Sequence, residues 1–452
     1  MRVCLDAYSI DLPHQTGIGV YARSLAAAYR ANGVMVDGLF GRIAPRFDDP
    51  ELAEIAFHRQ GIVVGDLPLR ERLRWFTDGL MGKVQASRVE RSGTVQYRPV
   101  AERFSCLDGV LNAPMPLGRA QRHFAKTGRF LTVRLPKDVE LMHWTMPVPI
   151  RAEGIKNIYT ILDLIPFVLP YATLGNAEHE MKMFRTILET ADQIVTISEF
   201  SRSEIARIFA VDKESILNTY LSASTEATIA AAPEDEIEKF VAASAGLQLR
   251  NYLLFVGAIE PRKNVERMID AYLKSATTLP LVVCSSSGWL NEETITRLDF
   301  LSRSLDGTSR MNGGGKRIIR INKAKDADIA RLIRGARAVV FPSLYEGFGL
   351  PVLEAMQLGT PVITSNTASM AEIAADAAIL VDPFAVDELA RAMETISSDD
   401  VTWSQLAAAG LARAETFSPK AFAERMRVVL NMPDRVRAKV PLTSAEGAPA
   451  GL

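Results

Sequence analysis

The sequence predicts an α/β protein built from two Rossmann-like, doubly wound domains. Short apolar runs alternate with helix-period segments, which is typical of parallel sheets covered by helices on both faces. A loop with glycines follows the first apolar run, and the same alternation starts again near Tyr252. At roughly 150 residues per domain, 452 residues suffice for two apolar cores.

In the first half we expect a strand at residues 2–7, a glycine loop, and then a helix at 20–31. Further strands are expected at 157–161 and 193–197, and a further helix at 201–209. The polar, alanine-rich stretch 231–246 is expected to link the halves, so the first domain is assigned to residues 1–235.

The second domain is assigned to residues 245–415 and opens with the buried strand YLLFVGAI. Further strands are expected at 281–284, 317–321, 338–341 and 361–364, and helices at 264–275, 326–334 and 351–357. We expect a C-terminal helix at 416–432 that crosses back to the first domain. Residues 433–452 are poor in aromatics and rich in Ala, Pro, Gly and Ser, which favours a mobile tail.

The composition excludes several classes of protein. A net charge of −1 gives no general case for a nucleic-acid partner. Three scattered cysteines argue against a disulfide framework or zinc site, and they indicate a reducing compartment. No signal-peptide pattern and no run of about 18 apolar residues is present, so we expect a cytoplasmic protein.

Residues 70–137 form a basic insertion with 14 Lys and Arg against 5 Asp and Glu. Within it, Trp75, Phe76 and Leu80 alternate with basic residues at roughly helical spacing. Such a helix could lie on an anionic membrane surface, which would place the protein at the inner face of the plasma membrane. The alternative is a solvated helix packed on the first domain.

The stretch FPSLYEGFGLPVLEAMQLGTPVITS, residues 341–365, predicts a strand, a glycine loop and a helix. Pro351 suits the first helical position, where its missing N–H costs nothing. The amides of Gly349 and Leu350 would point out of the helix start and cradle a phosphate or sugar oxygen. Two carboxylates flank the loop, Glu346 and Glu354, and a carboxylate accepts two hydrogen bonds from vicinal hydroxyls well. Glu354 could alternatively serve only the helix dipole.

This stretch resembles the E-x7-E signature of the family 4 retaining glycosyltransferases, which adopt the GT-B fold of two domains facing a cleft. Glu346 and Glu354 match its two acids, with Phe348, Gly349 and Leu350 between them. The resemblance implies that Glu354 holds the donor ribose, while Glu346 and the amides after it hold the transferred sugar. It extends through PVITSNTASMAEIAADAAILVDP and back to INKAKDADIARLIRGARAVVFPS.

A second element, FVGAIEPRKNVERMIDAY, places Arg262 and Lys263 between a strand end and a helix. Two cations there can neutralise a diphosphate as it leaves. By resemblance Lys263 matches a family lysine, Ala258 stands where relatives carry an arginine, and Arg262 is the candidate to replace that arginine. The alternative is a pair of surface charges on a turn. We assign Glu346, Arg262 and Lys263 to catalysis, by positioning and charge and with no metal.

The loop TGIGVYARSL offers Gly17 and Gly19 after the first strand. Alone this pair is only a turn signal, but relatives use the matching loop to contact the donor diphosphate and the acceptor. The loop is not a full G-x-G-x-x-G, which argues against hydride transfer.

The stretch IYTILDLIPF resembles the family's TIHDL segment, with Leu162 in place of the histidine and Asp163 kept. In relatives this histidine approaches the donor sugar, often near its C6 hydroxyl. Leucine cannot hydrogen-bond but packs well on a methyl group, which favours a 6-deoxyhexose donor. The alternative is an ordinary core leucine. We place Leu162 at the donor and Asp163 at the acceptor. His143 either contacts the acceptor or is packed, and packing is the commoner fate of a lone histidine.

Together these features predict a retaining glycosyltransferase that moves a hexose, or a 6-deoxyhexose, from a nucleotide-diphosphate donor. We expect a GDP-linked donor, no cofactor, and a glycan or lipid-linked glycan acceptor in the synthesis of O-antigen, capsule or exopolysaccharide. Two rivals remain. One is a non-hydrolysing sugar-nucleotide epimerase, and the other is a non-catalytic sugar-nucleotide-binding protein.

Overall fold

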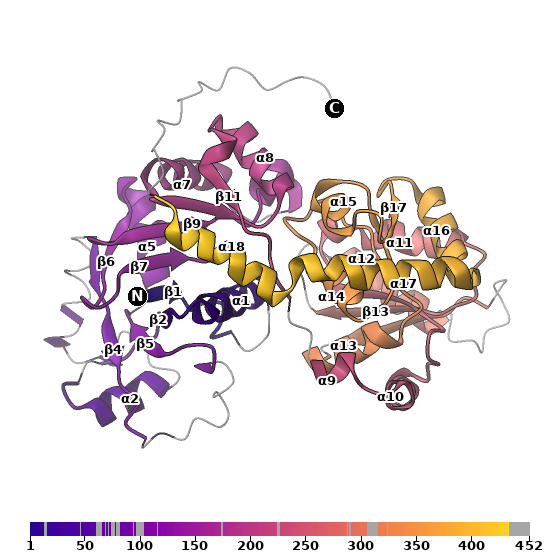
Figure 1. Cartoon of the computed structure of the whole chain (residues 1–452), viewed down its shortest axis with the longest axis horizontal. Coiled ribbons are helices and arrows are strands. Elements are labelled where there is room, and N and C mark those ends of the chain that lie inside the picture. The colour runs from indigo at the N-terminus through magenta and orange to yellow at the C-terminus, as the bar shows by residue number, and fades with distance from the viewer. Residues whose placement is uncertain are drawn as a thin grey trace.

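The computed structural model describes most of the chain. The described residues are 1–12, 16–45, 47–59, 66–67, 69–70, 72–73, 77, 82–93, 95, 104–114, 116–172, 175–223, 227–286, 288, 291–304, 315–322 and 324–433. They form two α/β domains side by side, each around its own sheet (Figure 1). The predicted fold class, α/β with two Rossmann-like domains, is confirmed.

The first domain contains an eight-stranded sheet in the order β11-β10-β9-β7-β1-β2-β5-β4. Its strands are β1 (Arg2–Asp6), β2 (Met35–Phe40), β4 (Ser87–Val89), β5 (Gly109–Asn112), β7 (Leu141–Trp144), β9 (Lys156–Thr160), β10 (Gln193–Thr196) and β11 (Ile216–Asn218). All neighbours are parallel except β4, which pairs antiparallel with β5. Polar loops that follow parallel strands therefore gather at one edge of the sheet.

Helices cover this sheet, and two buried apolar clusters fill the space between the layers. The helices are α1 (Gly17–Ala31), α2 (Pro50–His58), α5 (Pro116–Thr127), α6 (Ile165–Val168), α7 (Ala177–Thr190) and α8 (Glu199–Phe209). The domain also contains a small three-stranded sheet, made of β3 (Lys83–Gln85), β6 (Leu131–Arg134) and β8 (Ile150–Ala152), which was not predicted. Thr16 caps α1 by accepting the Gly19 amide at 3.1 Å, so the helix begins at Gly17, earlier than predicted.

The second domain contains a six-stranded, all-parallel sheet in the order β14-β13-β12-β15-β16-β17. Its strands are β12 (Leu253–Ala258), β13 (Leu281–Ser286), β14 (Ile318–Asn322), β15 (Ala338–Phe341), β16 (Val362–Ser365) and β17 (Ile379–Val381). Its helices are α9 (Ala227–Ala230), α10 (Glu234–Ala245), α11 (Val265–Lys274), α12 (Glu292–Ser304), α13 (Asp326–Gly335), α14 (Leu350–Gln357), α15 (Ala368–Ala374), α16 (Val386–Ser398) and α17 (Asp400–Ala414). The expected link 231–246 is largely helical, because α10 buries Ile237 and Val241 against this domain.

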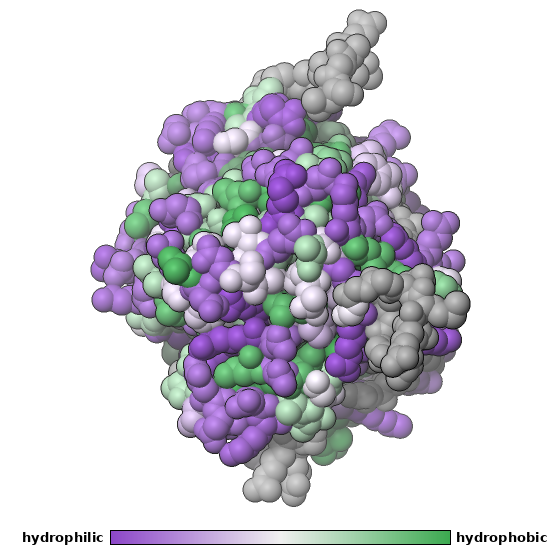
Figure 2. Space-filling view, turned by 90° about the vertical axis from the view of Figure 1, so that its right-hand side faces the viewer, coloured by the Kyte–Doolittle hydropathy of each residue, from purple (hydrophilic) through white to green (hydrophobic). Residues whose placement is uncertain are grey.

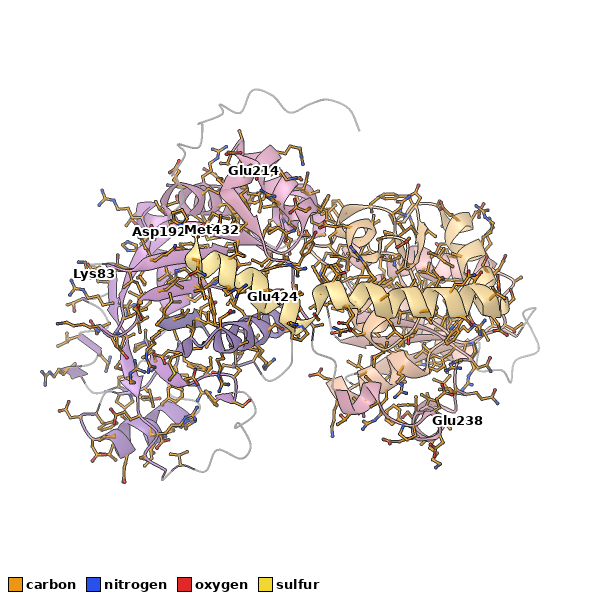
Figure 3. The ribbon with its side chains drawn as sticks, viewed as in Figure 1. Lys83, Asp192, Glu214, Glu238, Glu424 and Met432 are labelled. Carbon is orange, nitrogen blue, oxygen red and sulfur yellow. The ribbon has the colours of Figure 1, made fainter. Side chains whose placement is uncertain are left out.

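The last helix, α18 (Pro419–Asn431), returns to the first domain and lies along α1 (Figure 1). Asn32 donates from Nδ2 to the carbonyl of Ala423 at 2.8 Å. Farther along, Figure 3 places Met432 beside the first domain, where its carbonyl accepts from Lys156 Nζ at 3.1 Å. The chain thus crosses between the domains twice, before α9 and before α18.

The outer end of the second domain is mainly hydrophilic, with smaller apolar areas between (Figure 2). Across the described part of the chain, no helix has the length and hydropathy needed to span a bilayer. The proposed membrane-surface helix falls on Trp75, Phe76 and Leu80, which lie outside the described residues.

Candidate active site

The site begins where two neighbouring strands of the second sheet end. Strands β12 and β15 are adjacent and parallel, so the loops after them leave from the same edge. The loop after β12 makes one 3-10 turn, Pro261–Lys263, before α11. The loop after β15, residues 342–349, is called the donor loop below, and it leads into α14. This strand pairing brings together residues that lie 83 positions apart in the chain.

Three donors converge on one oxygen of Glu346. Its Oε1 accepts from Arg262 Nη1 at 2.6 Å, Lys263 Nζ at 2.5 Å and Ser343 Oγ at 2.7 Å. Arg262 also pairs with Glu260 through Nε at 2.9 Å. The side chains of Glu346 and Lys263 are only 11% and 9% exposed, so these pairs are shielded from water.

The pKa values follow from this packing. Burial favours the neutral form of Glu346, but Lys263 and Arg262 outweigh it and lower the pKa to about 2. Burial lowers the pKa of Lys263 against the pull of Glu346. Burial likewise disfavours the Arg262 cation, but Glu346 and Glu260 raise its pKa above the ordinary value. Glu346 is therefore a fixed negative charge at every physiological pH.

The donor loop needs its two glycines for different reasons. Gly349 has φ +98° and precedes the start of α14, a backbone geometry that L side chains rarely adopt. A Cβ on it would also lie 2.5 Å from Met370 Cε. At Gly347 a Cβ would lie 2.3 Å from the carbonyl oxygen of Leu162, which belongs to the other domain. The loop and the first domain are thus in direct contact.

The first domain brings Leu162, Asp163 and Gly17 to this loop. Burial raises the pKa of Asp163, and the nearby Arg262 cation opposes the rise. Gly17, the first residue of α1, lies close to Leu350, which directly follows the donor loop. A Cβ on Gly17 would be in ordinary van der Waals contact with Leu350 Cδ1, at 3.7 Å. The residues predicted from three separate sequence motifs therefore meet at one boundary between the domains.

Glu354 stands one turn into α14 and belongs to a different electrostatic environment. Burial raises its pKa to about 7, and the carboxylate of Asp326 on α13 adds to the rise. It has no part in the ion pairs around Glu346 described above. Near neutral pH a large fraction of Glu354 is protonated.

The structure places two predicted contact residues in the protein interior. His143 is fully buried, and its ring nitrogens meet Tyr29 Oη at 2.6 Å and Thr160 Oγ1 at 2.8 Å. Its ring offers no exposed atom to an acceptor, so the packed alternative describes it. The Phe348 ring packs edge-on against Phe417 with centroids 5.6 Å apart. The Phe348 side chain is therefore packed in the interior, with 3% of the residue exposed.

Sequence reasoning missed the supports of this site. Ser343 and Glu260 bind the charged side chains directly, and both lie in motifs that were singled out for other residues. Ser369 Oγ donates to the carbonyl of Glu346 at 2.8 Å. Gly19, the second glycine of the first loop, packs against the Ser9 carbonyl, where a Cβ would lie at 3.0 Å, so it serves the start of α1.

Comparisons with known proteins point to one family. The model described as "Glycosyl transferases group 1" matches residues 238–413. O-antigen chain mannosyltransferase B of Escherichia coli is 33% identical over 269 residues, covering 58% of this chain and 67% of that protein. The serotype-specific mannosyltransferase WbdA of Escherichia coli is 26% identical over 324 residues, 66% of this chain but only 38% of WbdA.

The structural comparison agrees on the fold. The crystal structure of Anabaena HepE in complex with UDP and glucose matches 95% of this chain and 99% of its own, with a TM-score of 0.63 and 13% identity. Family membership decides against the epimerase and the non-catalytic binding protein. The chain belongs to the group 1 glycosyltransferases and is a retaining glycosyltransferase of family 4 with the GT-B fold.

Proposed function

We propose that this protein transfers a hexose, with mannose as the first candidate, from a GDP-linked donor to a glycan or lipid-linked glycan acceptor. The observation that carries the proposal is the convergence of Arg262, Lys263 and Ser343 on Glu346, beside the contact of the donor loop with Leu162. The choice of mannose and of a surface polysaccharide such as O-antigen rests on the printed functions of the relatives.

The chemistry assigned to each residue follows from its charge. As the glycosidic bond breaks, negative charge grows on the leaving diphosphate, and the transferred carbon becomes positive. Arg262 and Lys263 stabilise the diphosphate without a metal, and they are already oriented by Glu346. The Leu350 amide at the start of α14 adds a positive partial charge, whereas Pro351 has no N–H and the Val352 amide already donates to the Gly349 carbonyl at 3.0 Å. Glu346 positions these groups and the sugar, and it is not a covalent nucleophile.

The remaining donor and acceptor contacts are assigned by position. The Glu354 carboxyl binds the donor ribose, and Leu350 and Gly17 lie beside the diphosphate, one from each domain, while Gly19 acts only through the start of α1. Asp163 is assigned to the acceptor because it belongs to the first domain, although its carboxyl also lies close enough to the Arg262 cation to be influenced by it. A 6-deoxyhexose, which carries a methyl group at C5, is the second candidate for the donor sugar, because Leu162 stands in place of the family's histidine and presents an apolar side chain.

The donor assay separates these possibilities. We expect GDP-mannose to release GDP faster with a glycan acceptor than without it, and the new glycosidic bond to keep the α configuration by NMR. Parallel reactions with UDP-glucose, GDP-fucose and GDP-perosamine test the donor. Faster turnover of a 6-deoxy donor would replace mannose by that sugar, and faster turnover of UDP-glucose would overturn the GDP assignment.

Membrane association is tested separately. Sedimentation with vesicles of anionic and of zwitterionic lipid at low salt measures whether the basic insertion 70–137 binds a surface. We expect association with anionic vesicles only. No association at low salt would remove the peripheral location from the proposal.

A further inference from the structure

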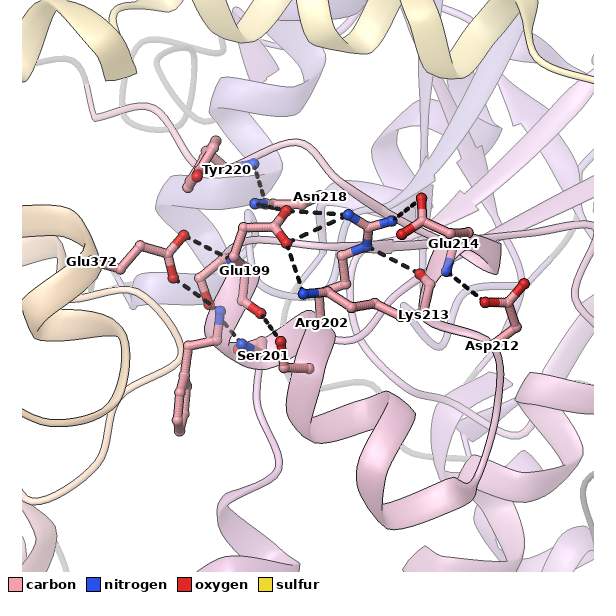
Figure 4. Close-up of polar contacts among 12 residues, drawn as sticks. Glu199, Ser201, Arg202, Asp212, Lys213, Glu214, Asn218, Tyr220 and Glu372 are labelled. Carbon is pink, nitrogen blue, oxygen red and sulfur yellow. Dashed lines mark hydrogen bonds and ion pairs between the residues drawn. The ribbon is translucent and has the colours of Figure 1, made fainter.

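A carboxylate of the second domain caps the N-terminus of a helix in the first domain. Glu372 lies on α15, and its Oε1 and Oε2 accept hydrogen bonds from the amides of Glu199 at 2.8 Å and Phe200 at 2.9 Å. These amides are the first two of α8. Figure 4 shows the carboxylate reaching across from the second domain to the start of that helix. The contact is bidentate and joins the two domains.

The first amides of a helix have no partner within the helix and carry a positive partial charge. In α8 the N-cap residue Ser198 accepts only the Ser201 amide, at 3.0 Å. The amides of Glu199 and Phe200 are satisfied by Glu372 instead. When the domains separate, the carboxylate and both amides must turn to water. This contact therefore exists only in the domain arrangement of this structure, which is called the closed arrangement below.

The same short helix, α15, also supports the donor loop. Ser369, three residues before Glu372, donates to the carbonyl of Glu346 at 2.8 Å. Met370 fills the space beside Gly349, where a Cβ would lie 2.5 Å from Met370 Cε. Helix α15 thus contacts the donor loop through Ser369 and Met370 and the first domain through Glu372.

Helix α8 holds the loop from the opposite side. Ser201 Oγ lies 3.1 Å from the Leu162 carbonyl oxygen and 3.4 Å from the Gly347 carbonyl oxygen. These two carbonyls belong to different domains, at the place where Gly347 approaches Leu162 most closely. The Glu372 contact consequently ties together the two helices that hold the loop between them.

The charged groups around the start of α8 are compatible with the Glu372 carboxylate. The Glu199 side chain, which starts the same helix, pairs with the cations of Arg202 and Lys213 at 3.4 Å each and accepts a hydrogen bond from Asn218 Nδ2 at 2.9 Å (Figure 4). Tyr220 stands beside Glu372, and burial together with that carboxylate raises the pKa of Tyr220 to about 12. With the charge of Glu199 compensated, the Glu372 carboxylate faces the positive end of the α8 dipole.

Tyr220 also marks the first crossing between the domains. It has φ +57°, which is uncommon for a residue with a side chain, and it follows β11 on the way to the second domain. Its ring lies 5.3 Å from Phe417, which in turn packs on Phe348 of the donor loop. The strained crossing, the Glu372 contact and the donor loop are packed together.

We infer that Glu372 is a positioning residue for the transfer reaction. Its bond to the start of α8 stabilises the closed state, and α15 passes that closure to Glu346 through Ser369 and Met370. The inference rests on the transferase activity of the family, and it does not depend on which donor or acceptor is used. Loss of Glu372 should lower the rate of transfer far more than it weakens donor binding.

The experiment compares Glu372→Ala and Glu372→Gln with a matched control, Glu394→Ala. Glu394 also accepts a backbone amide, from Ala276 at 2.6 Å, but wholly within the second domain. We expect Glu372→Ala to lower kcat by about 10- to 100-fold, the loss of hydrogen bonds to a charged group, with donor KM within about threefold. Glu372→Gln keeps one acceptor oxygen and should fall between, while Glu394→Ala should keep wild-type kcat.

A second readout does not need the donor. Spin labels at Glu178 and Glu238, exposed positions of the first and second domains, report the closed fraction of the ligand-free protein. We expect Glu372→Ala, but not Glu394→Ala, to shift the distances toward the open state. Wild-type distances and wild-type kcat in Glu372→Ala would overturn the inference, as would equal losses in both variants. If the wild type turns over no donor of the panel, the proposed donor is wrong. The distances between the two spin labels still decide whether Glu372 stabilises the closed arrangement.

Discussion

Lys263 and Glu346 meet with 2.5 Å between Nζ and Oε1, although 83 residues separate them in the chain. The pair forms because β12 and β15 are neighbours in the sheet and their following loops share one edge. Burial strengthens the attraction between the two charges, but it also costs free energy because both charges lose their hydration. Its place at the boundary between the two domains is the basis for our proposal that the pair is held ready for a charged ligand.

Gly347→Ala should block closure without unfolding either domain. The new Cβ would lie 2.3 Å from the Leu162 carbonyl oxygen and 3.0 Å from Asp163 Cβ, and both atoms belong to the other domain. Because the Leu162 backbone cannot move away without a large cost in free energy, the two domains could not approach as closely. We therefore expect kcat to fall by more than about 10-fold. Thermal melting is the control, and a melting temperature within about 2 °C of wild type is expected. A variant with wild-type kcat would contradict the closed geometry.

Glu354 gives a pH-dependent prediction for stability. Its pKa is about 7 in the folded chain and about 4.3 in an unfolded one, so the folded state binds more protons between these values. The contribution of this group to the free energy of unfolding therefore falls as the pH rises from about 4 to 7. We expect Glu354→Gln to melt a few degrees above the wild type at pH 8 and level with it at pH 5. A difference that is independent of pH would contradict the raised pKa of Glu354.

His143→Ala separates a packed histidine from an acceptor ligand. Burial lowers the pKa of His143 to about 3, so the ring is neutral and fixed between Tyr29 and Thr160. Its removal leaves a cavity and two hydroxyls without their partner, which costs about 2–4 kcal/mol. We expect urea unfolding to show this loss, and the acceptor KM of the folded enzyme to stay within about twofold. A large rise in acceptor KM with little loss of stability would restore the acceptor role.

The sequence predicted what depends on local pattern and strand topology. The strand 338–341 was placed without error. Glu346, Arg262 and Lys263 were assigned to one site from their charge and the family resemblance, and the structure brings them together because the loops after β12 and β15 leave one edge of the sheet. The glycines at 347 and 349 marked a loop with close backbone approaches.

What escaped prediction depends on contacts between elements that no local pattern records. Glu372 reads as an ordinary helical glutamate, and only the approach of α8 from the other domain gives it a partner. The link 231–246 read as polar, yet Ile237 and Val241 are spaced four apart and bury one side of a helix. The strands of the small sheet are three or four residues long, too short for a periodicity to be seen.

The most direct test of the account is the turnover of Lys263→Ala and Glu346→Ala, measured as nucleotide release in the presence of acceptor. Lys274→Ala is the matched control, because this exposed lysine pairs with Asp387 on the same domain, away from the donor loop. We predict that both site variants stay folded and lose more than about 100-fold in kcat, as expected for removal of a preorganised charge, while the control keeps wild-type activity. Near wild-type turnover in Lys263→Ala and Glu346→Ala would contradict the account.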